Sequence, residues 1–281
     1  MDPALHAQRR GSRLRAGLLG AEVHSATDGG TIARVEFPAE QQIRTVLLDI
    51  EGTTTPADFV YKTLFPYAER KLENFLQEHF AEPQIEALVR ELRLQRKSDE
   101  RQGLGPSHWL EDSRESQLRS AAEYSRWLMA RDSKCSALKA LQGAIWQEGY
   151  ARGALRGEVY PDVPPAFERW RGQGRTICIY SSGSELAQRL LFSSVSSGDL
   201  TAYITRYFDT RVGAKAESES YEKIAGELGR APNEVLFVSD AVREIEAAAA
   251  VGMKVALCAR ETDVETPVTE YPVVHTFDQI R

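Results

Sequence analysis

Four short, nearly continuous apolar runs, separated by segments of helical periodicity, constrain the fold of this chain more than any other feature. The runs cover residues 45–50, 176–180, 235–240 and 254–258. Such a run is typical of a parallel strand that is buried on both faces. Between the later runs, residues such as Tyr221, Ile224 and Leu228 follow the spacing of an amphipathic helix. The alternation predicts an α/β fold with a doubly wound parallel sheet.

The stretch from Phe59 to Leu155 has no strand signal and carries four helical stripes instead. The stripes lie at Ala68–Leu76, Ile85–Leu92, Leu118–Met129 and Leu138–Ile145. The polar run from Ser98 to Ser116 contains two glycines and a proline, which predicts a loop. We interpret residues 59–155 as a helical cap inserted after the first strand, over the carboxyl edge of the sheet. Residues 43–58 and 156–281 then form the core.

Residues 1–42 differ from the rest of the chain. Arginines and glycines gather in this segment and no helical period persists, so we expect a disordered leader. A cleaved targeting peptide is the alternative, because the first twenty residues are rich in arginine and poor in acids. Asp2, Glu22 and Asp28 argue against that alternative.

The composition of the chain limits the classes of function that it can have. The 281 residues carry 35 basic and 41 acidic side chains, a net charge of −6, which argues against a nucleic-acid or anionic-membrane surface. No apolar run reaches the roughly 18 residues that span a bilayer. Cys178 and Cys258 lie inside apolar runs and no CxxC pair occurs, which favours reduced, buried thiols. We expect a cytoplasmic monomer that acts on a small molecule.

Polar side chains follow the predicted strands where a parallel sheet binds its ligands, at the carboxyl ends. Asp49 and Glu51 close the first run, Ser181 and Ser182 follow the second, and Asp240 closes the third. Lys215 follows a glycine turn, and Glu244 lies one helical turn after Asp240. Carboxylates without histidine or cysteine suit Mg²⁺, and Mg²⁺ with a lysine and hydroxyl donors suits a phosphoryl group.

Each of these residues has an ordinary structural explanation when taken alone. An aspartate at the end of a strand often caps the next helix, the serines are typical turn residues, and a single lysine is usually a solvated side chain. Their order at successive strand ends of one sheet is what favours a shared site.

These residues resemble the four motifs of the haloacid dehalogenase superfamily. Several longer blocks are similar, more narrowly, to the enolase-phosphatases of methionine salvage. The blocks are residues 47–54, Leu141-Gln142-Gly143 with Ile145-Trp146, Val159-Tyr160-Pro161-Asp162-Val163, residues 180–184, Phe208-Asp209-Thr210 and Gly213 with Lys215. Glu51 stands where most of the superfamily phosphatases carry aspartate, as is usual in this family. The resemblance begins near Thr45 and leaves the leader unmatched.

The resemblance implies a role for each motif residue. Asp49 would be the nucleophile and Glu51 the acid that protonates the leaving oxygen. Ser181, Ser182 and Lys215 would bind the substrate's phosphoryl group. One Mg²⁺ per subunit would be held by Asp49, Asp240 and the backbone carbonyl of Glu51, and Glu244 would orient the waters of the metal.

The resemblance also implies the substrate, 2,3-diketo-5-methylthiopentyl-1-phosphate, which is enolised and then dephosphorylated to an acireductone. Two alternatives remain at this point: a phosphatase of the same superfamily that acts on another small phosphate, and a phospho-acceptor signalling domain. The large helical insert argues against the second, since a receiver domain is compact. A non-catalytic member of the superfamily that only binds its ligand is disfavoured, because no position of the catalytic set carries an inert residue.

Overall fold

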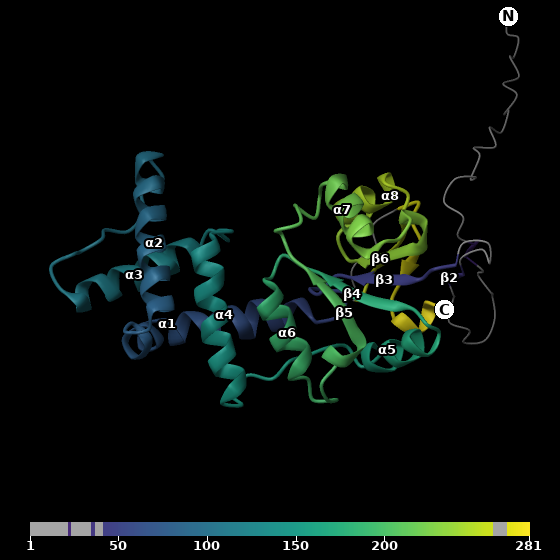
Figure 1. Cartoon of the computed structure of the whole chain (residues 1–281), viewed down its shortest axis with the longest axis horizontal. Helices are drawn as coiled ribbons and strands as arrows, with labels where there is room; N and C mark the ends of the chain where they lie inside the picture. Colours follow the sequence, from purple (N-terminus) through teal and green to yellow (C-terminus); the bar gives the residue numbers. More distant parts are fainter. Residues whose placement is uncertain (1–21, 24–34, 37–41, 261–268) are drawn as a thin grey trace, which may run out of the picture.

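The computed structural model describes residues 22–23, 35–36, 42–260 and 269–281. Figure 1 shows a sheet flanked by helices and, beside it, a group of helices that extends away from the sheet. The expected disordered leader, residues 1–42, lies outside the described residues except for its last residue and a short antiparallel pair. That pair joins β1 (Glu22–Val23) to β2 (Val35–Glu36) and is separate from the main sheet.

The main sheet has six parallel strands in the order β5-β4-β3-β6-β7-β8. The strands are β3 (Thr45–Leu48), β4 (Thr176–Tyr180), β5 (Ile204–Phe208), β6 (Val235–Ser239), β7 (Lys254–Cys258) and β8 (Val273–Val274). The central strand β3 pairs with both β4 and β6, with Thr45 opposite Thr176 on one side and Val235 on the other. The predicted parallel sheet is confirmed.

Helices cover both faces of the sheet. They are α5 (Val163–Gly172), α6 (Glu185–Ser193), α7 (Ser218–Leu228) and α8 (Val242–Ala250), with 3-10 turns at Thr201–Tyr203, Pro232–Glu234 and Phe277–Gln279. Val46 and Leu48 pack into a cluster with buried residues of α5 and α6, whereas Leu47 faces a second cluster with α7 and α8. Successive strand residues point to opposite faces. An apolar run without alternation is therefore what a doubly wound sheet requires.

Two strands of the main sheet were not predicted from the sequence. β5 lies at the edge of the sheet, where Thr205 and Arg206 are exposed and interrupt the apolar pattern. β8 has only two residues. Both omissions have the same physical cause, because an edge strand is not buried on both faces.

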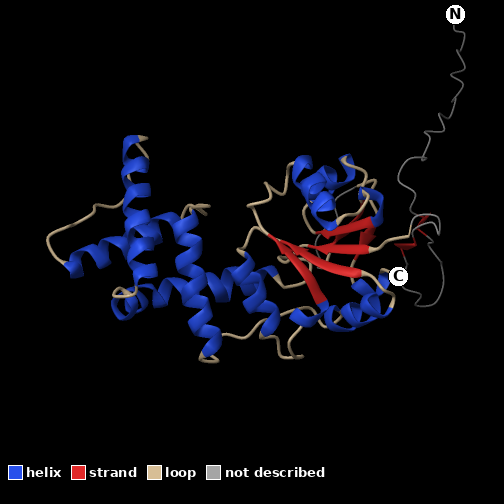
Figure 2. Ribbon diagram, in the orientation of Figure 1, coloured by secondary structure: helices blue, strands red, loops and turns tan. Residues whose placement is uncertain are grey.

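The residues between β3 and β4 begin with five helical segments and contain no strand (Figure 2). They are a π-helical segment (Phe59–Leu64), α1 (Phe65–His79), α2 (Pro83–Arg101), α3 (Arg114–Met129) and α4 (Ser136–Ala151). All four predicted stripes fall within α1–α4. No helix of the described residues is long and apolar enough to cross a bilayer. The exact boundaries between cap and core stay a prediction.

The predicted loop at Ser98–Ser116 is too long at both ends. α2 continues to Arg101 and α3 begins at Arg114, so the connection covers only 102–113. Hydrogen bonds from Arg96 to Glu100, one helical turn apart, extend α2 into the polar run. At the other end, Ser113 caps α3. The predicted loop was too long because polar side chains that pair with each other along a helix look like loop residues in the sequence.

The two cysteines of the apolar runs are buried and unpaired, as expected. Burial raises the pKa of both the Cys178 and Cys258 thiols to about 12. Cys135 is half-buried and also free.

A buried arginine after β7 ties three separate segments of the core together. Arg260 forms an ion pair with Asp162 at 2.6 Å, and its Nε and Nη2 donate to the carbonyl of Thr53 at 2.9 and 2.7 Å. The guanidinium lies between the rings of Tyr160 and Phe277, 4.4 Å from each centroid. The turn that follows β3 is thereby fixed to the start of α5 and to the C-terminal segment.

We expect Arg260→Met to lower the free energy of unfolding by about 3–5 kcal/mol, since it leaves the carboxylate of Asp162 buried without its partner. Urea unfolding followed by circular dichroism measures this loss. Arg206→Met is the matched control, because Arg206 and its partner Glu227 are about half exposed and an exposed pair contributes at most about 1 kcal/mol. Equal losses in the two variants would contradict a special role for Arg260.

Candidate active site

Three predicted site residues lie at the carboxyl ends of adjacent strands. Asp49 directly follows β3, Ser181 follows β4, and Asp240 follows β6. These strands are parallel neighbours, so the three residues share one edge of the sheet. This edge is where open α/β sheets bind their ligands.

Lys215 reaches this edge from the loop between β5 and α7. Its backbone carbonyl accepts a hydrogen bond from the Tyr221 hydroxyl at 2.7 Å. The hydroxyl of Tyr180 holds the same loop at the Gly213 carbonyl, at 3.0 Å. Both tyrosines are buried in the second core cluster. The position of the lysine is therefore set by core packing.

The Lys215 ammonium is shared between two carboxylates. Its Nζ lies 2.5 Å from Asp49 Oδ1 and 2.6 Å from Glu244 Oε2. Burial on its own lowers the pKa of Lys215, but the two carboxylates outweigh that effect and raise the pKa above its usual range. The family resemblance implied a role for Glu244 in orienting the waters of a metal. In the structure its direct partner is Lys215.

Asp49 is buried and fully engaged in hydrogen bonds. Its side chain is 4% exposed, and Oδ1 also accepts from the backbone N–H of Ile50 at 2.7 Å. Ser239 Oγ lies 3.0 Å from Asp49 Oδ2 and 2.8 Å from Glu244 Oε2, and its single proton serves one of them at a time. The carboxylate is held in one orientation from both of its oxygens.

Glu51 lies on the tight turn after β3, beside the first serine. Ser181 Oγ donates to Glu51 Oε2 at 3.3 Å and accepts from the N–H of Gly183 at 3.1 Å. Burial, followed by the negative charge of Asp49, raises the pKa of Glu51. A raised pKa favours the protonated carboxylic acid, which is the form that donates a proton.

Asp240 lies against the backbone of the same turn. A Cβ atom at Gly52 would come within 2.1 Å of Asp240 Oδ2, and Gly52 has a φ of +70°. Desolvation, followed by the charge of Asp49, raises the pKa of Asp240 to about 7, although the residue remains exposed. Glycine is required at position 52 for two reasons: the backbone there is left-handed, and the Asp240 carboxylate approaches it too closely for a side chain.

A cavity of about 390 Å³ adjoins this cluster, between the sheet edge and the helices of the insert. Glu51, Ser181 and Ser182 line it from the core, whereas Asp49, Lys215 and Asp240 lie outside its lining. The walls from the insert are mostly apolar. Among them, Phe65 stacks on Trp146 with 6.0 Å between ring centroids, and the indole donates to the Leu64 carbonyl at 2.9 Å.

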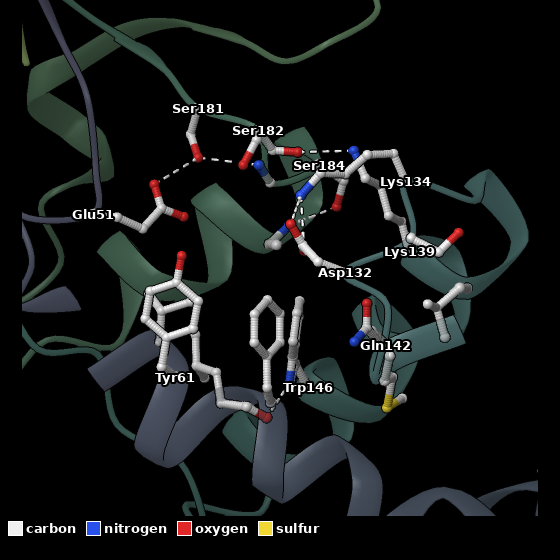
Figure 3. A pocket seen from close by; sticks show the side chains of 18 of the residues that line it. Glu51, Tyr61, Asp132, Lys134, Lys139, Gln142, Trp146, Ser181, Ser182 and Ser184 are labelled. Atoms are coloured by element: carbon white, nitrogen blue, oxygen red, sulfur yellow. Dashed lines mark hydrogen bonds and ion pairs between the residues drawn. The ribbon is translucent and has the colours of Figure 1, made fainter. Parts of the chain in front are cut away.

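The insert also contributes polar residues that the sequence analysis missed. Lys139 and Gln142 of α4 lie across the cavity from Glu51 in Figure 3. The Nζ of Lys139 donates to the Ser182 carbonyl at 3.0 Å and lies 3.3 Å from Thr210 Oγ1. Gln142 belongs to one of the blocks that carry the family resemblance. That block was the one available signal, and it did not indicate which side chains face the site.

The structure thus brings Asp49, Glu51, Asp240, Ser181 and Lys215 to one edge of the sheet, with Ser182 beside them in the cavity wall. Glu51 and Ser181 belong both to the charged cluster and to the cavity lining. A ligand in the cavity would therefore contact the cluster through these two residues.

Known proteins match this chain over most of its length. A family model described as haloacid dehalogenase-like hydrolase matches residues 43–252. The chain is 44% identical to enolase-phosphatase E1 of Synechococcus elongatus over 87% of this chain and 100% of that protein. It is 41% identical to enolase-phosphatase E1 of Danio rerio over 89% and 98%. Among solved structures, the UTR4 protein of Saccharomyces cerevisiae aligns with a TM-score of 0.69 at 32% identity, covering 84% of this chain and 99% of that one.

Proposed function

The chain belongs to the enolase-phosphatases, within the haloacid dehalogenase-like hydrolases, and from that premise we propose its substrate and the roles of its site residues. The substrate is 2,3-diketo-5-methylthiopentyl-1-phosphate, and the products are the acireductone 1,2-dihydroxy-3-keto-5-methylthiopentene and phosphate. The observation that carries the proposal is the charged cluster of Asp49, Lys215 and Glu51 beside a largely apolar cavity. The cluster suits a phosphoryl group, and the cavity suits a carbon chain that ends in a thioether.

Asp49 acts as the nucleophile. One carboxylate oxygen forms a bond to phosphorus while the bond from phosphorus to the substrate's ester oxygen breaks, which gives an aspartyl-phosphate. Water then hydrolyses this intermediate and regenerates Asp49. The ion pair with Lys215 supports the role, because an ammonium at 2.5 Å holds the attacking carboxylate in place.

Glu51 acts as the proton carrier of this reaction. It gives a proton to the ester oxygen as that oxygen leaves, and it later takes a proton from the attacking water. Its position supports the role, since its Oε2 meets Ser181 at the boundary between the charged cluster and the cavity. Ser181, Ser182 and Lys215 bind the transferred phosphoryl oxygens and offset their charge.

Enolase-phosphatases and their superfamily generally use Mg²⁺, and the residues present suit it. Asp49, Glu51, Asp240 and Glu244 gather four carboxylates, and among the described residues Lys215 is the one cation paired with any of them. This excess of oxygen-bearing negative charge favours a hard divalent cation. Asp49, Asp240 and the carbonyl of Glu51 would hold the ion, which when bound offsets the repulsion between phosphate and carboxylate. That the enzyme acts as a cytoplasmic monomer stays a prediction.

Product analysis by NMR tests the proposed function. We expect the protein with Mg²⁺ to convert the diketo phosphate to the acireductone and phosphate, and to turn over sugar phosphates far more slowly, because they lack an apolar tail. Asp49→Asn should release almost no phosphate while keeping its circular dichroism spectrum, since an amide cannot accept a phosphoryl group. Comparable turnover of sugar phosphates would favour a general phosphatase instead.

Glu51→Gln separates the two half-reactions. The amide keeps the size of the side chain and removes proton transfer, which typically contributes 10²–10⁴-fold. We expect phosphate release to fall by that factor and the enol phosphate to accumulate as a new ultraviolet absorbance. Phosphate release at the normal rate would exclude Glu51 as the acid, whereas the absence of any enol would show that Glu51 is needed before dephosphorylation.

Gly52→Ala tests the proposed metal site. The new Cβ would displace the Asp240 carboxylate, so we expect the affinity for Mg²⁺, measured by isothermal titration calorimetry, to fall at least tenfold, as for other changes that misplace a ligand of a metal. Gly103→Ala is the matched control. Gly103 has a similar φ of +74° and nothing within 4 Å of its added Cβ, so it imposes the same backbone strain without a clash. Equal loss of affinity in both variants would contradict the role of Asp240.

A further inference from the structure

Two polar residues of the insert, Lys139 and Gln142, have no role in the mechanism above, although both line the cavity. They lie three residues apart on α4 (Ser136–Ala151), so they share one face of the helix. We propose that Lys139 and Gln142 bind the two adjacent carbonyl oxygens of the substrate, and that Lys139 is a catalytic residue of the enolisation. This assignment rests on the proposed function and extends it to the first half-reaction.

The hydrogen bonds of Lys139 leave it one donor. An ammonium has three N–H groups. Two are directed to the Ser182 carbonyl and to Thr210 Oγ1, and no third acceptor lies within hydrogen-bonding distance among the described residues. The remaining donor belongs to a side chain that lines the cavity (Figure 3). The bond to Ser182 fixes this donor beside the proposed phosphoryl-binding loop, where the carbon atoms next to the phosphate must lie.

The charge of Lys139 differs in kind from that of Lys215. Lys215 is neutralised by two carboxylates, whereas Lys139 contacts only a carbonyl and a hydroxyl. A cation that is half-buried without a carboxylate partner attracts negative charge that develops nearby. Desolvation, followed by the charge of Lys134, lowers the pKa of Lys139, which also makes its proton easier to transfer.

Gln142 supplies the second, independent observation. The residue is only 7% exposed, yet its side-chain amide forms no hydrogen bond with any described residue. Because Gln142 lines the cavity, the unused donors and acceptor of its amide are available to a ligand that enters there. Figure 3 shows this side chain at the cavity wall below Lys139. The amide N–H₂ group suits the carbonyl oxygen next to the one that Lys139 binds.

The proposed step balances without any oxidant. The C1–H bond breaks and its electron pair forms the C1=C2 double bond, while the π electrons of the C2 carbonyl move to its oxygen. That oxygen takes a proton from the Lys139 ammonium, and the C1 proton passes to water in the cavity. Lys139 then regains a proton from solvent, and Glu51 takes no part until the phosphatase step.

A phosphonate analogue of the substrate, in which CH₂ replaces the ester oxygen, isolates the enolisation because it cannot be dephosphorylated. In D₂O, NMR follows deuterium entering C1. We expect Lys139→Met to slow this exchange about 10²–10³-fold, the usual loss when one preorganised donor to an oxyanion is removed. The inhibition constant of inorganic phosphate should stay within about twofold of wild type. Gln142→Met should weaken binding of the analogue about tenfold, as expected for one lost hydrogen bond.

Lys134→Met is the matched control. Lys134 lines the same cavity, but it is largely exposed and paired with Asp132 at 2.7 Å. Its loss removes only the smaller of the two effects that lower the pKa of Lys139, so it should slow the exchange far less than Lys139→Met does. Lys139→Arg separates loss of proton transfer from misfolding, because arginine keeps the positive charge but does not give up a proton. This variant should still bind the analogue, which shows that it is folded, and should exchange C1 slowly.

Three results would overturn the assignment. They are wild-type exchange in Lys139→Met, wild-type exchange in Lys139→Arg, and a loss of phosphate affinity in Lys139→Met that equals the loss of exchange. A wild-type protein that binds phosphate and never exchanges C1 would instead overturn the proposed function, and this assignment with it.

Discussion

The ion pairs of Lys215 with Asp49 and Glu244 are the interaction on which the rest of the site depends. Two carboxylates at 2.5 and 2.6 Å from one ammonium are stable in a buried place only because the charges offset one another. The core fixes the lysine from behind through the hydroxyls of Tyr180 and Tyr221. One ammonium balances only one of the two carboxylates that it contacts, and Asp240 and Glu51 add two further acidic groups to the cluster. The site is therefore built to receive a cation and a phosphoryl group together.

The core and the insert divide the work of recognition. The core supplies charge at the sheet edge, and the insert supplies mainly apolar walls, with Lys139 and Gln142 among the polar side chains between them. This division follows from the topology. The carboxyl ends of parallel strands gather oxygen and nitrogen atoms at one edge, whereas a helical insert that packs over this edge presents the apolar stripes of its helices. A substrate with a phosphate at one end and a thioether at the other matches the two surfaces.

Much of this architecture could be predicted from the sequence, for identifiable reasons. A strand buried on both faces must be apolar throughout, so β3, β4, β6 and β7 were visible, and parallel order brings Asp49, Ser181 and Asp240 to one edge. The roles assigned to these residues remain proposals. The edge strand β5 was missed because its exposed residues break the pattern. Lys139 and Gln142 were missed because the docking of α4 on the core decides which side of the helix faces the cavity, and no periodicity reports it.

The position of the insert in the chain has a consequence for biosynthesis. β3 can pair only after β4 and β6, its two neighbours in the sheet, have been synthesised. Both strands follow the whole insert in the chain. The helices of the insert make mainly contacts that are closer in sequence, and such contacts form faster than long-range strand pairing. On the ribosome, β3 would thus emerge before the insert and pair late, so that an apolar strand stays unpaired throughout synthesis of the insert. Until β4 and β6 have been synthesised, such a nascent chain is prone to aggregation, and rapid synthesis of these later strands would shorten that exposure.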